Sequence, residues 1–282
     1  MRGDSSTEIA RDQASGAEDQ KPERDPGRGA GRLTVVSLGP GKSHYLAPAA
    51  KAALSKAEVI VGYKTYMELI EPEILAGKKT LTSGMTGEIK RCRIAIDHAL
   101  EGKNTAIVSS GDSGIYGMAG LIIELVAEQG LLDKVEVDII PGISALSSAA
   151  ALLGAPLMHD FAVVSLSDLM TSWDEIEARV DAAARTDFVL VIYNPRSRKR
   201  DWQLTRVREV ILKYRDENTP AGIVRNAARK GESVRITTLS RMDESTVDML
   251  SILLVGNSKT RVIGARMVTP RGYLEKYDVG RG

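Results

Sequence analysis

Three glycine-containing segments in the first half of the 282-residue chain follow apolar runs and could hold a small ligand. They are Ser37-Leu-Gly-Pro-Gly41, Ser109-Ser-Gly-Asp-Ser-Gly-Ile-Tyr-Gly117 and Pro141-Gly-Ile-Ser-Ala145. Glycine lets a ligand approach the backbone closely, and in open α/β sheets ligands bind beyond the carboxyl ends of the strands. Together the three turns predict one binding cleft, although each by itself is also explained as a tight turn without a ligand.

The first turn runs into Gly41-Lys-Ser43, which matches the end of a nucleotide-triphosphate loop. That loop requires glycine where this chain has Val36, and the dinucleotide fingerprint requires a third glycine where it has His44. The sequence therefore argues against both nucleotide sites, and nucleotide-triphosphate hydrolysis is only a weak alternative.

Two polar residues of these turns have structural as well as functional explanations. Asp112 could act as a general base or contact a ligand, and Ser144 could contact a ligand. Either residue could instead cap the N-terminus of the helix that follows it. The sequence leaves both alternatives open.

The second half contains a cationic cluster and a histidine–aspartate pair. Arg196, Arg198, Lys199 and Arg200 lie within five residues after an apolar run, and could bind a polyanionic substrate through charge-assisted hydrogen bonds. A solvated helix N-terminus is the alternative, although the helix dipole disfavours cations there. His159 and Asp160 precede another apolar run and are candidate general bases, but a lone histidine beside a strand is more often structural.

Short apolar runs alternate with segments of helical period, which predicts a mostly parallel α/β sheet in the first half and a mixed sheet in the second. Expected strands are 33–38, 59–61, 105–109, 135–140, 161–166, 188–193, 221–224, 233–238 and 252–255, with 262–267 as a possible further strand. Expected helices are 45–55, 87–101, 115–129, 143–153, 173–184 and 202–215. Gly154-Ala-Pro156 is the expected domain boundary, which gives a disordered tail at 1–31 and domains at 32–153 and 154–275.

The composition excludes several classes of protein. Thirty-eight basic and 37 acidic residues give a formal charge of +1, so no overall field favours nucleic acid or an anionic membrane as a partner. Cys92 is the only cysteine, and we expect it to pack on a helix. The three histidines lack metal-ligand spacing, so no protein metal site is expected. No run approaches the roughly 18 apolar residues of a membrane span, and the cytoplasm is the expected compartment.

Taken together, these motifs resemble the tetrapyrrole (corrin/porphyrin) methylases over about residues 33–273. The motifs that carry the resemblance are Gly-Pro-Gly at 39–41, Gly-Asp-Ser-Gly-Ile-Tyr-Gly-Met at 111–118, Pro-Gly-Ile-Ser-Ala at 141–145, Tyr-Asn-Pro at 193–195, Val-Gly-Asn-Ser-Lys-Thr at 255–260 and Thr-Pro-Arg-Gly-Tyr at 269–273. The motifs of the second half are most similar to the precorrin-3B C17-methyltransferases of cobalamin biosynthesis.

The resemblance implies two α/β domains with S-adenosyl-methionine in the cleft between them, and a homodimer. The positions that match cofactor contacts are Pro40, Gly41, Gly111, Asp112, Ile115, Tyr116, Ser144, Ala145, Asn194 and Ala227. Two residues depart from the family pattern, because Ser37 replaces a glycine and Ser113 replaces the proline of many relatives. A side chain at Ser37 could crowd the cofactor, so Ser37→Gly is expected to keep or improve cofactor affinity, whereas a marked loss would mean that the hydroxyl makes a contact of its own.

The implied reaction is methylation of carbon 17 of precorrin-3B, or its cobalt form, with contraction of the macrocycle. Positioning supplies most of the rate of such a transfer, and no nucleophilic side chain is required. The contraction could use one of the candidate bases, and the carboxylates of the substrate would give the cationic cluster a purpose. The alternatives are another precorrin methyltransferase of the same pathway and a non-catalytic cofactor-binding module.

Overall fold

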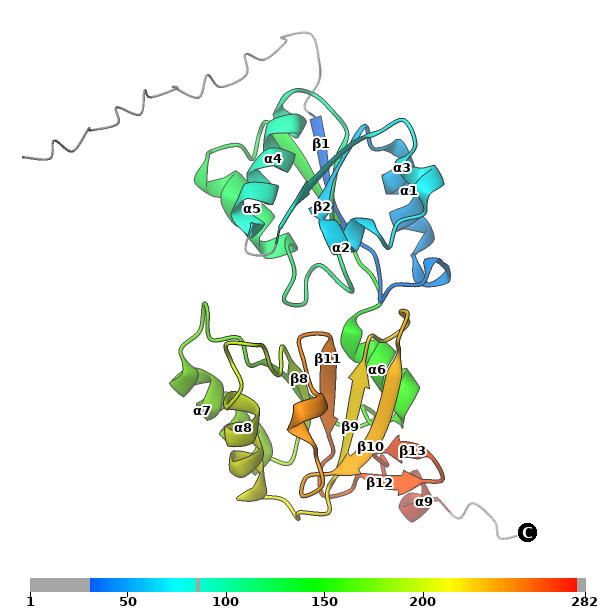
Figure 1. Cartoon of the computed structure of the whole chain (residues 1–282), viewed down its shortest axis with the longest axis vertical. Helices are drawn as coiled ribbons and strands as arrows, with labels where there is room; N and C mark the ends of the chain where they lie inside the picture. Colours follow the sequence, from blue (N-terminus) through cyan, green and yellow to red (C-terminus); the bar gives the residue numbers. More distant parts are fainter. Residues whose placement is uncertain (1–30, 85–86, 278–282) are drawn as a thin grey trace, which may run out of the picture.

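The computed structural model describes residues 31–84 and 87–277, which form two α/β domains stacked end to end (Figure 1). The expected tail at 1–31 lies outside the described residues except for Gly31, which begins the first strand. Within the described part of the chain, no helix is long and apolar enough to cross a membrane.

The N-terminal domain is built on a parallel five-stranded sheet in the order β3-β2-β4-β1-β5. Its strands are β1 (Gly31–Ser37), β2 (Val59–Tyr63), β3 (Lys79–Ser83), β4 (Thr105–Ser109) and β5 (Val135–Ile140). Helices α4 (Glu88–Leu100) and α5 (Ala119–Glu128) pack on one face. The other face is covered by α1 (Pro48–Lys56), α2 (Lys64–Met67) and α3 (Pro72–Leu75). Cys92 is fully buried on α4, as predicted.

The C-terminal domain contains the expected mixed sheet, in the order β10-β9-β11-β8-β7. Its strands are β7 (Phe161–Ser165), β8 (Val189–Tyr193), β9 (Pro220–Arg225), β10 (Ser233–Thr238) and β11 (Ser251–Val255). Strands β7 and β8 are parallel, whereas β11 runs antiparallel to both β8 and β9. Helices α7 (Trp173–Arg185) and α8 (Gln203–Leu212) pack on one face of this sheet. They bury the larger of the two hydrophobic clusters that pack against the sheet.

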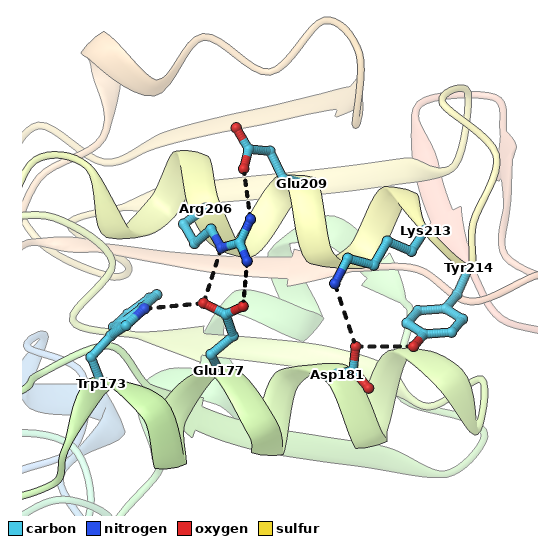
Figure 2. Close-up of polar contacts among 7 residues, drawn as sticks. All are labelled: Trp173, Glu177, Asp181, Arg206, Glu209, Lys213 and Tyr214. Atoms are coloured by element: carbon cyan, nitrogen blue, oxygen red, sulfur yellow. Dashed lines mark hydrogen bonds and ion pairs between the residues drawn. The ribbon is translucent and has the colours of Figure 1, made fainter.

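Polar side chains join α7 to α8 along their exposed seam (Figure 2). The Arg206 guanidinium donates through Nε and Nη2 to the two carboxylate oxygens of Glu177, at 3.0 and 2.6 Å. Trp173 Nε1 donates to the same carboxylate at 3.1 Å. These hydrogen bonds lower the pKa of Glu177, with the bond from Arg206 as the largest cause. Asp181 of α7 adds a second link, since it accepts from the Tyr214 hydroxyl at 3.0 Å and lies 3.9 Å from Lys213 Nζ.

Helix α6 (Ala145–Leu153) corrects the expected domain boundary at 153/154. Its buried residues Ala149 and Leu153 pack against β8, β9 and β11 of the second sheet. A Cβ added to Gly222 would lie 2.4 Å from Leu153 Cδ1, so the glycine makes room for this contact. The change of domain therefore lies before α6, because the second sheet buries the apolar face of the helix. Figure 1 shows α6 beside the C-terminal sheet.

Several element boundaries also differ from the expectations. The helix expected from residue 45 begins at Pro48, since proline is favoured in the first turn. The helix expected from residue 115 begins at Ala119, because residues 112–118 form turns. The single strand expected at 262–267 is a hairpin, with β12 (Arg261–Ile263) and β13 (Arg266–Val268) joined at Gly264, where φ is +58°. The sequence analysis missed β3, α2, α3, the two-residue strand β6 (Gly154–Ala155) and α9 (Tyr273–Lys276).

Candidate functional site

The three glycine-containing turns meet at one edge of the N-terminal sheet, as predicted. Strand β1 lies between β4 and β5, so the turns that follow these three parallel strands are neighbours. Gly39 and Gly111 exchange two backbone hydrogen bonds, with Gly39 N donating to Gly111 O at 3.0 Å and Gly111 N donating to Gly39 O at 2.7 Å. Both glycines have positive φ, +69° and +66°, which other residues rarely adopt.

The third turn packs directly onto the other two. A Cβ on Gly142 would lie 2.5 Å from Gly111 O and 2.7 Å from Ser37 Cβ, so only glycine fits there. The Asp112 carboxylate accepts from Gly114 N at 2.8 Å and from Gly142 N at 2.9 Å. One oxygen of Asp112 therefore closes its own turn, while the other holds the third turn. This brace between the second and third turns is a contact that the sequence did not suggest.

Ser37 is bonded to the second turn through its side chain. Its side chain is fully buried, and that of Ser113 is almost so. Ser37 Oγ donates to Ser113 Oγ at 3.0 Å and accepts from Ser113 N at 2.9 Å. The two residues that depart from the family pattern are therefore partners, and the expected crowding by the Ser37 hydroxyl is replaced by a contact within the protein.

Ser144 caps helix α6, one of the two roles proposed for it. Its Oγ accepts from Ser147 N at 3.3 Å. The N–H of Leu146, which also lies in the first turn of the helix, donates to the Tyr193 hydroxyl at 3.0 Å. Since Tyr193 ends β8, this bond ties the third turn to the C-terminal sheet. Burial is the largest cause of the raised pKa of Tyr193, so the phenol stays neutral and accepts the bond.

Two predicted cofactor residues, Tyr116 and Asn194, come together on the C-terminal side. They share a cavity of about 320 Å³ whose other lining residues include Ser165, Ser167 and Arg179. The Tyr116 hydroxyl donates to Val163 O at 3.2 Å, across the interface between the domains. Asn194 Nδ2 donates to Ser165 Oγ at 2.9 Å. Both Tyr116 and Asn194 have positive φ, +52° and +49°, and strained residues of this kind cluster at ligand sites.

The four cations expected to bind substrate have different environments. Arg200 is buried, donates to Asn194 O at 2.7 Å and lies 3.9 Å from Asp168. Arg196 donates to Glu244 O at 2.7 Å. These two side chains hold the loop that carries Asn194. Arg198 and Lys199 are exposed, and they are the two cations of the cluster that remain accessible to an anionic ligand.

His159 and Asp160 lie away from the three turns. Both precede Phe161 at the start of β7, whereas Ser165, at the end of the same strand, borders the cavity that holds Tyr116. His159 and Asp160 instead line a separate cavity of about 270 Å³ with Arg271. The structure does not bring these two candidate bases together with Asp112. Among the residues described, no group of three or more histidine, cysteine or acidic side chains could hold a metal ion.

Arg229 reaches the turns from the C-terminal domain and was missed by the sequence analysis. Its Nε donates to Pro40 O at 2.7 Å, and its Nη2 forms a short hydrogen bond with Ser110 Oγ. Its Cγ lies 2.6 Å from the position that a Cβ on Gly41 would occupy. In the sequence Arg229 follows the predicted contact Ala227 by two residues, but only the tertiary structure brings it to the first two turns.

The turns suit a cofactor that is held largely by backbone groups, as the resemblance to the methylases implies. Gly41 and Gly111 have no side chains to block the cleft, and both have positive φ, +152° and +66°. A Cβ on Gly111 would meet only Ala145 N and Ser144 Cα, at 3.6 and 3.9 Å. The predicted residues Pro40, Gly41, Gly111, Ser144 and Ala145 therefore frame one region, and Ile115 lies in the turn between Asp112 and Tyr116. Ala227 lies on the loop that carries Arg229.

Comparison with known proteins agrees with this arrangement. The family model of the Tetrapyrrole (Corrin/Porphyrin) Methylases matches residues 32–243. A protein of Salmonella typhimurium named "Probable cobalt-factor III C(17)-methyltransferase" is 49% identical over 241 residues, which cover 86% of this chain and 99% of that protein. The "Cobalt-factor III methyltransferase" of Priestia megaterium is 44% identical over 89% of this chain, but this chain matches only 47% of that longer protein.

Solved structures give the same result. The methyltransferase CobJ superimposes with a TM-score of 0.79 at 35% identity, over 85% of this chain and all of CobJ. The cobalt precorrin-4 methyltransferase CbiF has a TM-score of 0.65 at 20% identity, over 80% of this chain and 94% of CbiF, and so shares the fold. With a family model that matches residues 32–243 and a relative that matches over 99% of its own length at 49% identity, this protein belongs to the tetrapyrrole (corrin/porphyrin) methylase family.

Proposed function

We propose that this protein transfers a methyl group from S-adenosyl-methionine to carbon 17 of cobalt-factor III in cobalamin biosynthesis. The observation that carries the proposal is the 49% identity, over 99% of its length, to a relative named for that reaction. The three turns that meet at one edge of the N-terminal sheet support it, because they supply a glycine-lined backbone site beside the C-terminal domain.

S-adenosyl-methionine supplies an activated methyl group on a sulfonium. The task of the protein is to hold the methyl donor and the accepting carbon in line and to exclude water, and such positioning accounts for much of the rate. The Asp112 carboxylate and the Ser37–Ser113 pair fix the turns relative to one another. The bonds from Tyr116 to Val163 and from Leu146 to Tyr193 fix the second and third turns relative to the C-terminal sheet.

We also propose that the methylation is accompanied by ring contraction, as the resemblance to the C17-methyltransferases implies. Of the three candidate bases, Asp112 is the one that lies at the turns. If Asp112 removes a proton during contraction, Asp112→Asn should give a methylated product with an uncontracted ring. If Asp112 only braces the turns, the same variant should bind S-adenosyl-homocysteine more weakly.

The deciding experiment is a turnover assay of the purified protein with S-adenosyl-methionine and, in parallel, cobalt-factor III and metal-free precorrin-3B. We expect a mass increase of one methyl group on the cobalt substrate, at carbon 17 by NMR. Methylation at another ring carbon would identify a different methyltransferase of the pathway. Absence of any heat of binding with S-adenosyl-methionine would contradict every methylase function.

The homodimer and the cytoplasmic location are further parts of this proposal; the homodimer rests on the resemblance to the family, and the location is the expectation from the sequence. Light scattering coupled to size exclusion gives the mass in solution, and we expect twice the 30.4 kDa of one chain. A mass of one chain would contradict the dimer without affecting the proposed reaction.

A further inference from the structure

Arg229 has a position at the cleft that the proposed reaction does not yet explain. It lies on the loop between β9 and β10, at the end of the C-terminal domain that faces the N-terminal domain (Figure 1). Asn226 and Ala228 in this loop both have positive φ, +51° and +57°. The Ala228 N–H donates to Glu232 at 2.6 Å, which fixes the unusual conformation. The loop is thus held in a strained form that carries Arg229 to the first and second turns.

The contacts of Arg229 leave its charge uncompensated. Its two hydrogen bonds go to a backbone carbonyl, that of Pro40, and to the hydroxyl of Ser110. Among residues 31–84 and 87–277, no carboxylate lies within 4.0 Å of the Arg229 guanidinium. By contrast, Arg225 at the end of β9 forms an ion pair with Asp248 at 2.9 Å. Burial lowers the pKa of Arg229, and the nearby Tyr66 phenol only partly opposes this effect. A half-buried guanidinium without a counterion is costly, and an anionic ligand would relieve that cost.

Arg229 also retains donors that a ligand could reach. Guanidinium has five N–H donors, and the two hydrogen bonds use Nε and Nη2. In the described part of the chain, the buried side-chain atoms without a partner are Gln203 Oε1, Arg215 Nε and Glu244 Oε1. The Nη1 group of Arg229 makes no hydrogen bond to the described residues and is not among these atoms, so it is not fully buried. Its planar donors match a carboxylate.

We propose that Arg229 binds a ligand carboxylate at the cofactor cleft, where its contacts with Pro40 and Ser110 hold the guanidinium in position. The inference rests on the proposed methyltransferase function. Two ligands of that reaction carry carboxylates, namely the amino-acid end of S-adenosyl-methionine and the acidic side chains of the tetrapyrrole. Either would meet a fixed cation that already touches the turns.

The test compares two cofactor analogues on wild type, Arg229→Gln and Arg229→Lys. S-adenosyl-homocysteine has the carboxylate, and methylthioadenosine lacks the whole amino-acid end. If Arg229 binds the cofactor carboxylate, calorimetry should show that Arg229→Gln loses about 10-fold or more in affinity for S-adenosyl-homocysteine but little for methylthioadenosine. Arg229→Lys keeps the charge and should recover part of the loss, and it serves as the folded variant if Arg229→Gln is unstable.

If Arg229 binds a tetrapyrrole carboxylate instead, both analogues should bind the variants as they bind wild type, and the KM for the tetrapyrrole should rise about 10-fold or more. Lys230→Gln is the matched control, because Lys230 is the exposed neighbouring cation and should change neither quantity. Unchanged analogue affinities together with an unchanged KM would overturn the assignment while leaving the methyltransferase function intact. Failure of wild type to bind either analogue would overturn both proposals.

Discussion

The Ser37–Ser113 pair allows a sharp test of how the first two turns are held together. Ser37→Ala removes the hydroxyl but keeps the Cβ that packs near Gly142. The Ser113 N–H then loses its acceptor while it stays buried, because Ser113 is 1% exposed. An orphaned buried donor costs about 1–3 kcal/mol, so the free energy of unfolding of the N-terminal domain should fall by that amount.

The companion variants separate the two hydrogen bonds of the pair. Ser113→Ala keeps the N–H donor and its bond to Ser37 Oγ, but it removes the acceptor of the buried Ser37 hydroxyl, which should also cost about 1–3 kcal/mol. The double variant should be less destabilised than the sum of the singles, since both remove the same interaction. Ser55→Ala is the control, because the exposed Ser55 hydroxyl bonds only to Lys51 O on α1.

Two measurements check this prediction. Urea unfolding followed by circular dichroism gives the free energies, and hydrogen exchange of a peptide over residues 110–118 reports the Ser113 amide directly. Ser37→Gly should weaken the binding of S-adenosyl-homocysteine, in contrast to the expectation from the sequence, because the turns lose a contact. If Ser37→Ala is within about 0.5 kcal/mol of wild type and amide exchange is unchanged, the pair does not hold the turns.

Three further predictions concern other parts of the structure. Gly142→Ala should destabilise the protein by about 1–3 kcal/mol in urea unfolding, because its Cβ would overlap Gly111 O and Ser37 Cβ, whereas Gly120→Ala in helix α5, with open space around it, should be neutral or stabilising. If the exposed Arg198 and Lys199 bind substrate, charge reversal at these two positions should raise the KM for the tetrapyrrole without changing the affinity for S-adenosyl-homocysteine. Arg200→Gln should instead lower the melting temperature, because the buried Arg200 guanidinium donates to Asn194 O. Arg206→Gln should lower the melting temperature at neutral pH, because Glu177 loses its guanidinium partner. The pKa of Glu177 is depressed in the folded state, so the stabilisation by the pair is present above the unfolded-state pKa of about 4.3 and is lost as the pH falls through the folded-state pKa. The melting temperatures of variant and wild type should therefore converge in acid.

The local patterns of the sequence predicted most of the elements that carry the site. Strands β4 and β5 begin and end where the apolar runs do, and the turns after β1, β4 and β5 lie together as parallel topology requires. Strand β3 was missed because it is an edge strand in which Leu81 is the one apolar residue and no position is buried. Helix α6 was assigned to the wrong domain because its apolar face does not say which sheet covers it.

The roles of individual site residues depended on contacts between distant parts of the chain. The sequence by itself determined the class of fold, the three glycine turns and the resemblance to the methylases, because these follow from local periodicity and short motifs. Only the tertiary structure showed that Ser37 and Ser113 are partners across 76 residues, that Asp112 holds Gly142, and that Arg229 reaches Pro40 across 189 residues. Hydrogen bonds of this kind depend on where the folded backbone places two groups, and residue type alone does not encode that placement.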